Sequence, residues 1–417
     1  MVISLKRRYK PALLVLKSQE EGIGAAMREF VYHIPTKVYF GNTQLLHLGD
    51  ELKKYGNKVL FCYGGGSIKK NGLYDRVIES IRNAGLSWFE LSGIDPNPRL
   101  TSAHRGADIC KKEKIDVLLA VGGGSVIDCA KLVAAAAFYE GNEWDIVTRA
   151  YYPTKALPIV DISTVSGTGS DMDSTGVITN AETAEKKAFS FPELLRPKAS
   201  FLIPELTYSV SRRQTACGSA DILSHAIESY FVPADGSMYL LDAFKEGLMR
   251  TVIRYAPVAM EQPDNEEARA NLQWAASWAI NGFSSAMQNV SWTCHPIEHE
   301  ISAFYDITHG LGLAVITPKW MWYILNDTTV NRFYDYGVNV FGIDASIPRM
   351  KVAKESIVRT EDFLYRTLKL ENSLSALGIG RENFEIMAQR VCYAHGTLPG
   401  YLPLKQKDVM AILEMSL

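Results

Sequence analysis

The pattern that most constrains the fold of this chain changes near Pro204. Upstream, short apolar segments such as KVLFCY (58–63) and VLLAV (117–121) alternate with amphipathic segments. Strict alternation of strand and helix patterns predicts a parallel, doubly wound sheet with helices on both faces. Downstream, apolar residues recur with helical spacing almost to the C-terminus. The sequence therefore predicts an α/β domain over 27–204 and an all-α domain over 205–417.

The second domain is predicted to consist of long helices. Each pattern places apolar residues three and four positions apart, so that one face of the helix can pack against its neighbours. The predicted helices cover 212–231, 238–260, 265–289, 296–304, 309–325, 350–372 and 381–395.

The first residues of the chain continue neither pattern. Basic residues precede the apolar stretch ALLVL (12–16), which is shorter than the roughly 7–15 residues of a secretory signal core. The ordered pattern begins near Met27. Residues 1–26 are therefore expected to be a flexible N-terminal extension.

Composition narrows the functional class. The 417 residues carry 44 basic and 46 acidic side chains, a formal net charge of −2, with no long run of one sign. This balance disfavours a nucleic-acid surface or a membrane-binding face. No apolar segment reaches the roughly 20 residues that span a bilayer. We expect an enzyme that acts on a small molecule.

The cysteines favour a reducing compartment. They show no CxxC motif and no regular spacing, unlike a disulfide framework or a zinc ribbon. Buried free thiols in a cytoplasmic protein are the prediction. The six cysteines are Cys62, Cys110, Cys129, Cys217, Cys294 and Cys392.

Two predicted strands end in the same tetrapeptide, Gly-Gly-Gly-Ser. The first copy occupies 64–67 and the second 122–125, where a helix follows at once. Glycines let the backbone turn tightly and approach a ligand, and a helix N-terminus offers free N–H groups to a phosphate. Neither copy matches GxGxxG, so a tight turn without a ligand is the alternative for each. Two such turns in one sheet favour a dinucleotide site.

The first turn bears on the choice of dinucleotide. Sites that prefer NAD often place an acidic residue near the adenosine ribose, where it binds the 2′-hydroxyl. Here Ser67, Lys69 and Lys70 follow the glycines, and no acidic residue stands in the turn. A hydroxyl and two ammonium groups can bind a phosphate. The turn therefore favours NADP(H) over NAD(H), although a solvated lysine pair would give the same pattern.

Acidic and imidazole side chains recur at helical spacing in the second domain. Asp221 and His225 are four residues apart and share one helix face, and His295 and His299 repeat this spacing. Any one of these histidines alone is explained by core packing or helix capping. Together they favour a metal site. A carboxylate with imidazoles suits Fe(II), Zn(II), Co(II) or Ni(II).

A further histidine, His309, can join the site only if the chain turns. On a straight helix it would lie about 21 Å from His295. The segment FYDITHG (304–310) is typical of such a turn. Spacing alone leaves open whether His295 or His299 is the third ligand. Because Pro296 disfavours helical geometry at the residue before it, His295 is expected at a kink or at a helix start.

Five motifs together resemble those of the iron-containing (group III) alcohol dehydrogenases. The resemblance covers essentially all of 27–417, and it is with the NADPH-dependent butanol dehydrogenase and aldehyde reductase branch in particular. It implies a Rossmann-like dinucleotide-binding domain followed by an all-α metal-binding domain, an arrangement shared with dehydroquinate synthase. The motifs are YGGGSIKKNGLYD, VGGGSVIDCAK, SGTGSDMDS, GSADILSHAIESYF and HPIEHEISAFYDITHG.

The resemblance also implies roles for individual residues. His299 lines the site and is the candidate for catalytic proton transfer, with an orienting role as the alternative. The implied metal ligands are Asp221, His225, His295 and His309. The implied cofactor contacts are Gly64, Gly65, Gly66, Ser67, Lys69, Gly122, Gly123, Gly124, Ser125, Asp128, Thr164, Thr168 and Lys186.

The implied reaction is reversible hydride transfer between NADPH and a small aldehyde or primary alcohol such as butanal or butanol. One divalent ion, Fe(II) or Zn(II), would hold the substrate oxygen. Trp292, Phe304 and Tyr305 are candidates for an apolar substrate pocket, and core packing explains them equally well. The resemblance further implies a homodimer.

Three other functions are compatible with parts of this sequence pattern. A metal-dependent lyase of the dehydroquinate synthase kind shares the fold but needs a basic pocket, and 291–310 contains no lysine or arginine. A dehydrogenase of polyols that prefers NADH would share both fold and metal. A non-catalytic nucleotide or metal binder is disfavoured, since a full set of candidate ligands accompanies the glycine turns.

Overall fold

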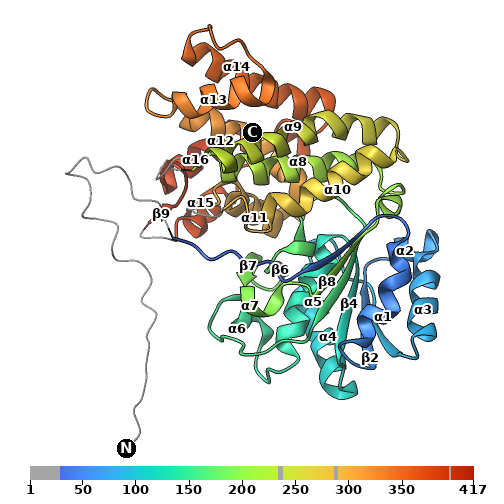
Figure 1. Ribbon diagram of the computed structural model, residues 1–417. Helices are drawn as coiled ribbons and strands as arrows, with labels where there is room; N and C mark the ends of the chain where they lie inside the picture. The colour runs from blue at the N-terminus through green and yellow to red at the C-terminus, as the bar shows by residue number, and fades with distance from the viewer. Residues whose placement is uncertain (1–28, 233–237, 286–289, 394–395) are drawn as a thin grey trace, which may run out of the picture.

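A computed structural model describes residues 29–417 except for 233–237, 286–289 and 394–395. The predicted N-terminal extension, 1–26, lies outside the described residues. Figure 1 shows an α/β part, coloured blue to green, against a helical part, coloured yellow-green to red. Among the described residues, no helix is both long enough and apolar enough to cross a membrane.

Six parallel strands form the centre of the α/β part. Their order is β1-β8-β5-β4-β2-β3, and every neighbouring pair is parallel. The central strands β4 and β5 are buried along their whole length, as expected for a parallel sheet covered on both faces. The predicted doubly wound sheet is confirmed. The strands are β1 (Lys37–Phe40), β2 (Lys58–Tyr63), β3 (Ser87–Leu91), β4 (Val117–Gly122), β5 (Ile159–Ser163) and β8 (Ala199–Leu202).

Helices cover the two faces of this sheet. On one face, Leu48 of α1 and Val77 of α3 share an apolar cluster with Phe61. On the other face, Ala107 of α4 and Val133 of α5 belong to a second apolar cluster. Burial of both clusters fixes the sheet between two helical layers. The helices of this part are α1 (Leu48–Lys53), α2 (Ser67–Lys70), α3 (Leu73–Asn83), α4 (Leu100–Glu113), α5 (Gly124–Ala136), α6 (Glu143–Val147) and α7 (Pro192–Leu195).

A separate antiparallel hairpin reaches the helical part. It consists of β6 (Thr175–Asn180) and β7 (Glu185–Ser190). Strand β6 contacts α5, and β7 contacts α11 of the helical part. Figure 1 shows the hairpin between the two parts, so residues on it can lie close to both.

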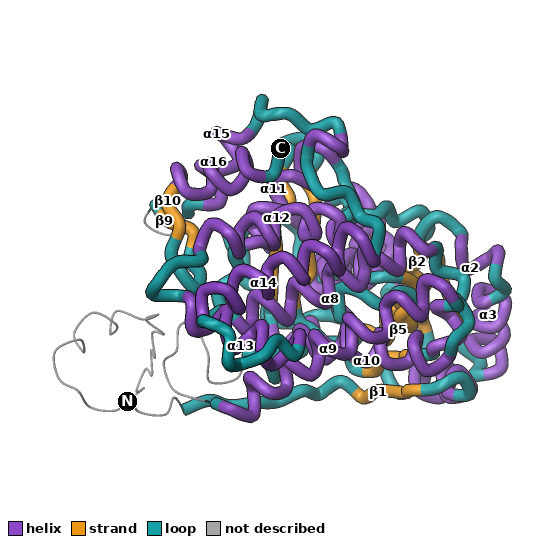
Figure 2. The backbone as a smooth tube through the Cα atoms, turned by 90° about the horizontal axis from the view of Figure 1, so that it is seen from above, coloured by secondary structure: helices purple, strands orange, loops and turns teal. Residues whose placement is uncertain are grey.

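The helical part has a single large apolar core, to which helices from α8 to α16 contribute. Figure 2 shows several of these helices side by side. A short antiparallel pair, β9 (Thr397–Leu398) and β10 (Leu404–Lys405), is the one strand pairing described in this part. The helices are α8 (Arg212–Tyr230), α9 (Tyr239–Glu261), α10 (Glu266–Ile280), α11 (Cys294–Tyr305), α12 (His309–Ile324), α13 (Val330–Phe341), α14 (Arg349–Glu361), α15 (Phe384–Val391) and α16 (Gln406–Met415).

The helical part differs most from the sequence prediction at one helix end and in two helices that were not predicted. The helix expected over 265–289 ends at Ile280, because Asn281 is followed by Gly282 with a φ of 96°. Helices α13 and α16 lie outside the predicted ranges. Helix α13 contains glycine, asparagine and β-branched residues that disfavour helix. It forms because it packs closely on α14, where a Cβ at Gly337 would lie 2.8 Å from Val352.

The two parts touch where helix α8 meets the loop after β5. A Cβ at Gly218 would lie 2.1 Å from the carbonyl oxygen of Ser166 and 3.6 Å from the Cα of Gly167. Only a residue without a side chain allows this approach. The close contact brings α8, which carries the predicted ligands Asp221 and His225, to the carboxyl edge of the sheet, where ligands of parallel α/β folds bind.

This contact predicts opposite effects for two mid-helix glycines. Gly218→Ala should lower the melting temperature, because the methyl group meets backbone that cannot yield, an overpacking cost of about 1–3 kcal/mol. Gly247→Ala, in α9, should leave the melting temperature unchanged or raise it, since the nearest atom to its Cβ is a side-chain nitrogen at 3.9 Å and alanine favours helix. Thermal unfolding of both variants measures the difference. Equal melting temperatures would contradict the close contact.

Candidate metal centre and cofactor cleft

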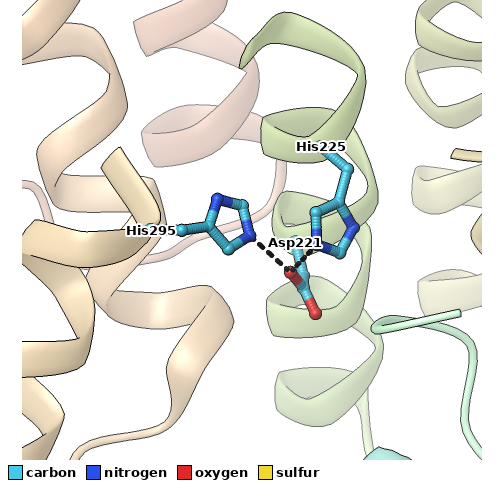
Figure 3. A group of neighbouring side chains, drawn as sticks. All are labelled: Asp221, His225 and His295. Atoms are coloured by element: carbon cyan, nitrogen blue, oxygen red, sulfur yellow. Dashed lines mark ion pairs between the residues drawn. The ribbon is translucent and has the colours of Figure 1, made fainter. Parts of the chain in front are cut away.

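The candidate metal centre begins on helix α8. Asp221 and His225 lie one turn apart, and Nε2 of His225 is 3.6 Å from Oδ1 of Asp221. Both side chains are buried. Figure 3 shows both of them turned toward His295, which comes from another helix. The spacing of four residues has therefore placed a carboxylate and an imidazole on one inward face, as the sequence predicts.

The other two predicted ligands come from the starts of two further helices. Helix α11 begins at Cys294, so that His295 and Pro296 lie in its first turn, where proline costs no hydrogen bond. The predicted helix start at His295 is confirmed. The chain then leaves α11 at Asp306, which has a φ of 51°, and α12 begins at His309. The predicted turn between the two histidines is confirmed as well.

Three imidazoles converge on one oxygen atom. Nε2 of His295 and Nε2 of His309 each lie 3.8 Å from Oδ1 of Asp221, close to the 3.6 Å of His225. These distances are too long for hydrogen bonds. In a tetrahedral zinc site with bonds of 2.0–2.1 Å, neighbouring ligand atoms lie about 3.4 Å apart. The ligand atoms of Asp221, His225 and His295 also lie within 4.8 Å of one another, so a small cation fits between them, and Nε2 of His309 faces the same oxygen.

Burial supports the same conclusion. Oδ1 of Asp221 and Nε2 of His295 are buried without a hydrogen-bond partner among the described residues. Leaving such groups unpaired costs free energy that native proteins rarely accept. A bound divalent cation would satisfy both atoms. The donor set of one carboxylate and three imidazoles suits Fe(II) or Zn(II).

Two buried glutamates lie behind the imidazoles. Nδ1 of His295 donates to Oε1 of Glu228, and Nδ1 of His309 donates to Oε2 of Glu298. Each bond fixes the tautomer in which the Nε2 lone pair is free for a metal. Glu228 also accepts the backbone N–H groups of Thr293 (2.6 Å) and Cys294 (2.7 Å), at the N-terminus of α11. These contacts hold the ligand rings in place.

A repeated pattern in the sequence indicates both glutamates, although neither was predicted as a site residue. His225-Ala-Ile-Glu228 and His295-Pro-Ile-Glu298 repeat one pattern, in which a glutamate follows a ligand histidine by one helical turn. Each glutamate serves a histidine other than the one in its own tetrapeptide. Spacing within a helix could suggest the two residues but not that Glu228 bonds to His295 and Glu298 to His309.

Positive charge stabilises the cage, the cluster of Asp221, His225, His295 and His309. Burial lowers the pKa of His225 to about 4. Burial would also lower the pKa of His295, but the carboxylates of Glu228 and Asp221 raise it to about 10. Burial would raise the pKa of Asp221, yet the imidazoles of His225, His295 and His309 hold that pKa below its usual range. A metal cation would supply the charge that a proton supplies in its absence.

His299, the predicted proton-transfer residue, lies beside the cage. Its ring centroid is 5.4 Å from that of His309 and 6.4 Å from that of His295. It is partly exposed. Burial and the nearby charges of Lys186 and His309 hold the pKa of His299 well below its ordinary value. The lowered pKa makes this ring a weak proton acceptor, so its role in proton transfer stays a prediction that rests on its position beside the cage.

Trp292 covers another side of the ligand rings. Its ring lies 4.9 Å from that of His295 and 5.6 Å from that of His225, edge to face in both cases. The indole is half-buried. Phe304 and Tyr305, by contrast, pack against the core of the helical part. Of these three aromatic residues, Trp292 is therefore the one that contacts the ligand histidines.

Both glycine turns lie at the carboxyl edge of the sheet, on neighbouring strands β2 and β4. The second turn leads into α5, whose N-cap, Gly123, forms no side-chain capping bond. Its first N–H groups are therefore available to an anion. A Cβ at Gly124 would lie 2.2 Å from Oγ1 of Thr168. The turn thus packs directly on the loop that follows β5.

The first turn is more open. No atom lies within 4 Å of a Cβ built at Gly65 or Gly66, and Gly66 has a φ of 101°. Ser67 is exposed. The ammonium of Lys69 lies 4.6 Å from the ring centroid of Tyr74 and 5.1 Å from that of Tyr63. Space for a ligand is therefore present next to this serine and lysine.

An acidic residue near this turn was not foreseen. Glu90 of β3 accepts hydrogen bonds from Tyr63 (2.5 Å) and Tyr74 (2.6 Å), the two rings under Lys69. Burial would raise the pKa of Glu90, but the two tyrosine hydroxyls and Lys69 lower it. The carboxylate is therefore ionised and held on the flank of the turn. Glu90 lies close to the turn because β3 pairs with β2, and this pairing leaves no local pattern in the sequence.

Asp128 is hydrogen-bonded to the loop that follows β5 and to strand β6. Oδ1 of Asp128 accepts Ser170 Oγ at 2.5 Å, and Oδ2 accepts the N–H of Val177 at 3.0 Å. The N–H of Thr164 donates to Gly122, which ties the loop to the second glycine turn. A contact of Asp128 with a cofactor stays a prediction, since both of its oxygens are engaged within the protein.

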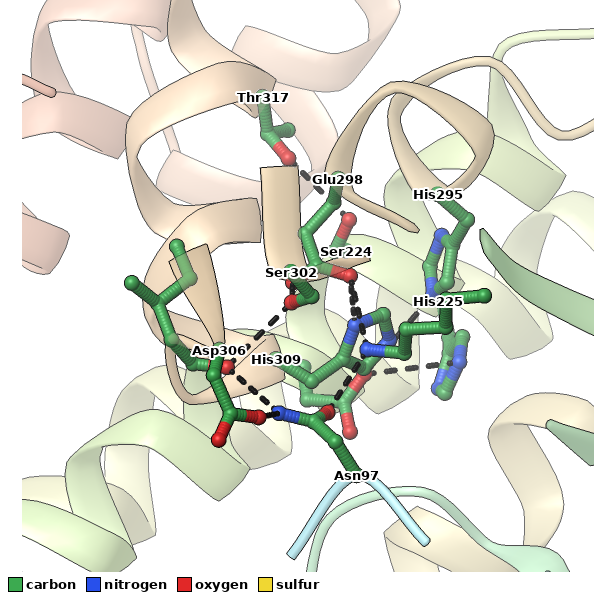
Figure 4. A network of polar contacts seen from close by, with 12 residues as sticks. Asn97, Ser224, His225, His295, Glu298, Ser302, Asp306, His309 and Thr317 are labelled. Atoms are coloured by element: carbon green, nitrogen blue, oxygen red, sulfur yellow. Dashed lines mark hydrogen bonds and ion pairs between the residues drawn. The ribbon is translucent and has the colours of Figure 1, made fainter. Parts of the chain in front are cut away.

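Lys186 lies between the α/β part and the metal cage. It is buried on strand β7, and its ammonium donates to Oδ1 of Asn97 at 2.9 Å and lies 3.5 Å from Oε2 of Glu298. Figure 4 shows this network around His309. Asn97 was not singled out from the sequence, because nothing in its own segment indicates proximity to residues two hundred positions away.

Comparison with known proteins agrees with this geometry. The family model for iron-containing alcohol dehydrogenase matches residues 35–204, and the model for the C-terminal part of the Fe-containing alcohol dehydrogenase family matches 215–417. The chain is 47% identical to NADH-dependent butanol dehydrogenase A of Clostridium acetobutylicum, over 94% of this chain and 100% of the relative. It is 32% identical to the NADPH-dependent aldehyde reductase YqhD of Escherichia coli, over 88% and 93%.

The fold matches solved structures equally well. NADH-dependent butanol dehydrogenase A from Thermotoga maritima superposes with a TM-score of 0.88 at 38% identity, covering 94% of this chain and 99% of that one. Escherichia coli YqhD superposes with a TM-score of 0.88 at 29% identity, covering 94% and 100%. The expected arrangement of an α/β domain followed by a helical one is confirmed.

The geometry predicts which substitutions at the site remove the metal. His309→Ala and Asp221→Ala should reduce bound metal from one ion per chain to a small fraction, because each removes an atom of the cage. His299→Ala should keep its metal, since its ring lies beside the cage. Elemental analysis after dialysis measures the content. Retention by His309→Ala together with loss by His299→Ala would show that the ligand set is wrong.

Proposed function

Because this chain belongs to the iron-containing alcohol dehydrogenase family, whose members are oxidoreductases of alcohols and aldehydes, we propose that it transfers hydride reversibly between NADPH and small aldehydes or primary alcohols. Butanal and butanol are the proposed substrates. The observation that carries the proposal is the convergence of three imidazole nitrogens on Oδ1 of Asp221, at 3.6–3.8 Å. This cage adjoins the loops that would hold a nicotinamide.

The proposed division of labour follows the two parts of the chain. Residues 27–204 hold the dinucleotide and 205–417 hold the metal. Asp221, His225, His295 and His309 are the proposed ligands, and a bound Fe(II) or Zn(II) supplies Lewis acidity to the substrate oxygen. Nicotinamide supplies the hydride chemistry itself.

The side chains around the cage orient the reactants and move the proton. Glu228 and Glu298 keep the ligand rings aimed. Trp292 shields the rings of His225 and His295 from water on one side. His299, neutral and partly exposed, accepts the proton when an alcohol is oxidised and returns one when an aldehyde is reduced. Each of these roles is a proposal about this chain's own residues.

The cofactor contacts are proposed on the two glycine turns and the loop after β5. The pyrophosphate is assigned to the N-terminus of α5, which is uncapped by side chains. Thr164, Thr168, Asp128 and Lys186 complete the proposed set. The preference for NADP(H) is supported by the open first turn, where Ser67 and Lys69 can meet a 2′-phosphate. Relatives named as NADH-dependent and as NADPH-dependent both occur.

The lyase alternative loses support on two grounds. The relatives compared above are named as dehydrogenases and a reductase. The one lysine at the cage, Lys186, is already paired with Glu298 and Asn97, so it offers no unpaired charge to an anionic substrate. An NADH-preferring polyol dehydrogenase remains the second candidate, because Glu90 places an ionised carboxylate near the first turn.

The reaction is tested by metal reconstitution. Protein stripped with a chelator and reloaded with Fe(II) without oxygen, or with Zn(II), should oxidise NADPH in the presence of butanal. The stripped protein should be inactive and regain activity on reloading. Absorbance of the reduced nicotinamide measures the rate. Absence of turnover with butanal and longer and shorter aldehydes by the metal-loaded protein would overturn the proposed function.

Coenzyme preference is tested at Ser67. Wild-type kcat/KM should be higher with NADPH than with NADH. Ser67→Asp should lower kcat/KM for NADPH by about 10- to 100-fold, because a carboxylate repels the 2′-phosphate and removes a hydrogen bond to a charged group. The same variant should leave kcat/KM for NADH nearly unchanged. Equal losses with both coenzymes would place Ser67 away from the ribose.

A homodimer in the cytoplasm is also proposed. Phe40 and Trp274 are partly exposed and in ring contact, and Leu240 is exposed close in sequence to the start of α9. A pocket of about 300 Å³ between α9 and α10, lined by Phe244 and Trp278, extends this apolar surface. Contiguous apolar surface of this kind is typical of subunit contacts. The six cysteines are all free, as suits a reducing compartment.

Light scattering tests the dimer. The purified protein should have twice the mass of one chain. Leu240→Glu should shift the protein toward the monomer if this surface is the contact, because an ionised side chain is costly to bury. A wild-type mass equal to one chain would contradict the proposal.

A further inference from the structure

Of the four proposed ligands, His309 has the most exposed side chain, and it lies at the start of a helix. It is the first residue of α12, and the chain enters it from Asp306, whose φ is 51°. Its side chain is 21% exposed, compared with 10% for His295 and 3% for His225. A ring at the end of a helix needs a partner outside its own backbone to keep a fixed direction.

Glu298 provides that partner. Its Oε2 accepts the Nδ1 hydrogen of His309, and its Oε1 accepts the hydroxyl of Ser302. The carboxylate is fully buried on α11. The carboxylate is therefore fixed against one nitrogen of the ring.

The space for Glu298 exists because residue 312 is a glycine. A Cβ at Gly312 would lie 2.7 Å from Cγ and 3.0 Å from Oε1 of Glu298. Gly312 lies within α12, in the turn that follows His309. The start of α12 thus both carries the ligand and leaves room for the carboxylate that orients it.

Lys186 joins this carboxylate from the other part of the molecule. Its ammonium is 3.5 Å from Oε2 of Glu298 and is buried with it. A buried carboxylate is tolerated only when charge and hydrogen bonds compensate it. Lys186 also donates to Oδ1 of Asn97 at 2.9 Å. The lysine is therefore shared between the helical part and the loop that precedes α4.

Asn97 connects Lys186 to the segment that leads into His309. Its amide nitrogen donates to Oδ1 of Asp306 at 3.0 Å and to the carbonyl of Ile307 at 3.1 Å, in the segment that leads into His309. Figure 4 shows Asn97 below this segment and Glu298 above His309. The direction of the His309 ring is thus held from both sides, and one of them belongs to the α/β part.

We propose that Glu298 is a positioning residue that aims His309 at the metal and couples this aim, through Lys186, to the dinucleotide-binding part. The inference rests on the proposed metal site and on the proposed contact of Lys186 with the cofactor. The effect of Glu298 is exerted on the ligand ring and on the lysine.

Metal affinity tests the positioning role. Stripped Glu298→Gln protein, titrated with Zn(II) against a competing chelator, should bind about 10- to 100-fold more weakly than wild type, the range for groups that orient metal ligands. The visible spectrum of the Co(II)-loaded variant should also change, because the fourth ligand is misaimed. A loss of general stability alone would not alter that spectrum.

Glu300→Gln is the matched control. Glu300 lies on the same helix, is also buried, with 8% exposure compared with 0% for Glu298, and pairs with Arg390 at 3.3 Å. The control should keep wild-type Zn(II) affinity and the wild-type Co(II) spectrum. If Glu298→Gln binds Zn(II) like wild type, or if Glu300→Gln loses affinity equally, the positioning role is overturned.

A double-mutant cycle tests the coupling. Lys186→Met should change Zn(II) affinity by a factor that differs by at least about twofold between the wild-type and Glu298→Gln backgrounds. Simple repulsion between Lys186 and the cation would give the same factor in both backgrounds, and this result would overturn the coupling.

The failure of this inference is distinguishable from failure of the proposed function. Wild-type protein that binds Zn(II) and reduces butanal, with an unaffected Glu298→Gln variant, overturns the inference alone. Wild-type protein that binds no Zn(II) overturns both.

Discussion

Three imidazole nitrogens surround one carboxylate oxygen at distances that suit a cation between them and suit no hydrogen bond. The arrangement is costly without positive charge, because Asp221, Glu228 and Glu298 are all buried close together. It persists because α8, α11 and α12 share one large apolar core that fixes their relative positions. The chemistry proposed for the chain follows from this cage and from its place beside the sheet.

The cage and the sheet meet through a small number of close contacts. Gly218 lets α8 approach the loop after β5, and the hairpin β6–β7 carries Lys186 to the ligand helices. A metal-bound substrate and a nicotinamide need to be held at fixed distance for hydride transfer. Contacts among Glu298, Lys186, Asn97 and the His309 segment connect the two parts of the molecule.

Much of this arrangement was predictable from periodicity and spacing. The alternating pattern gave the parallel sheet, and the pair Asp221 and His225 shared a helix face because four residues make about one turn. The turn at 304–310 brought His309 back to the cage, as expected. Spacing left open the choice between His295 and His299, and family resemblance selected His295. In the structure His295 is grouped with Asp221 and His225.

Other features depend on contacts between distant segments and left no local pattern. Asn97 reaches Asp306, and Glu90 reaches Tyr63, only after the sheet and helices have assembled. The pairing of Glu228 with His295 and of Glu298 with His309 has the same origin. Helix α13 was missed because its propensity is poor and its packing against α14 decides its conformation.

X-ray absorption at the zinc edge of the Zn(II)-loaded protein examines the cage most directly. The account predicts three imidazole nitrogens and at least one oxygen at about 2.0–2.2 Å, with the outer-shell scattering that imidazole rings produce. A sulfur neighbour at about 2.3 Å, or an environment of oxygen atoms without imidazole scattering, would contradict it.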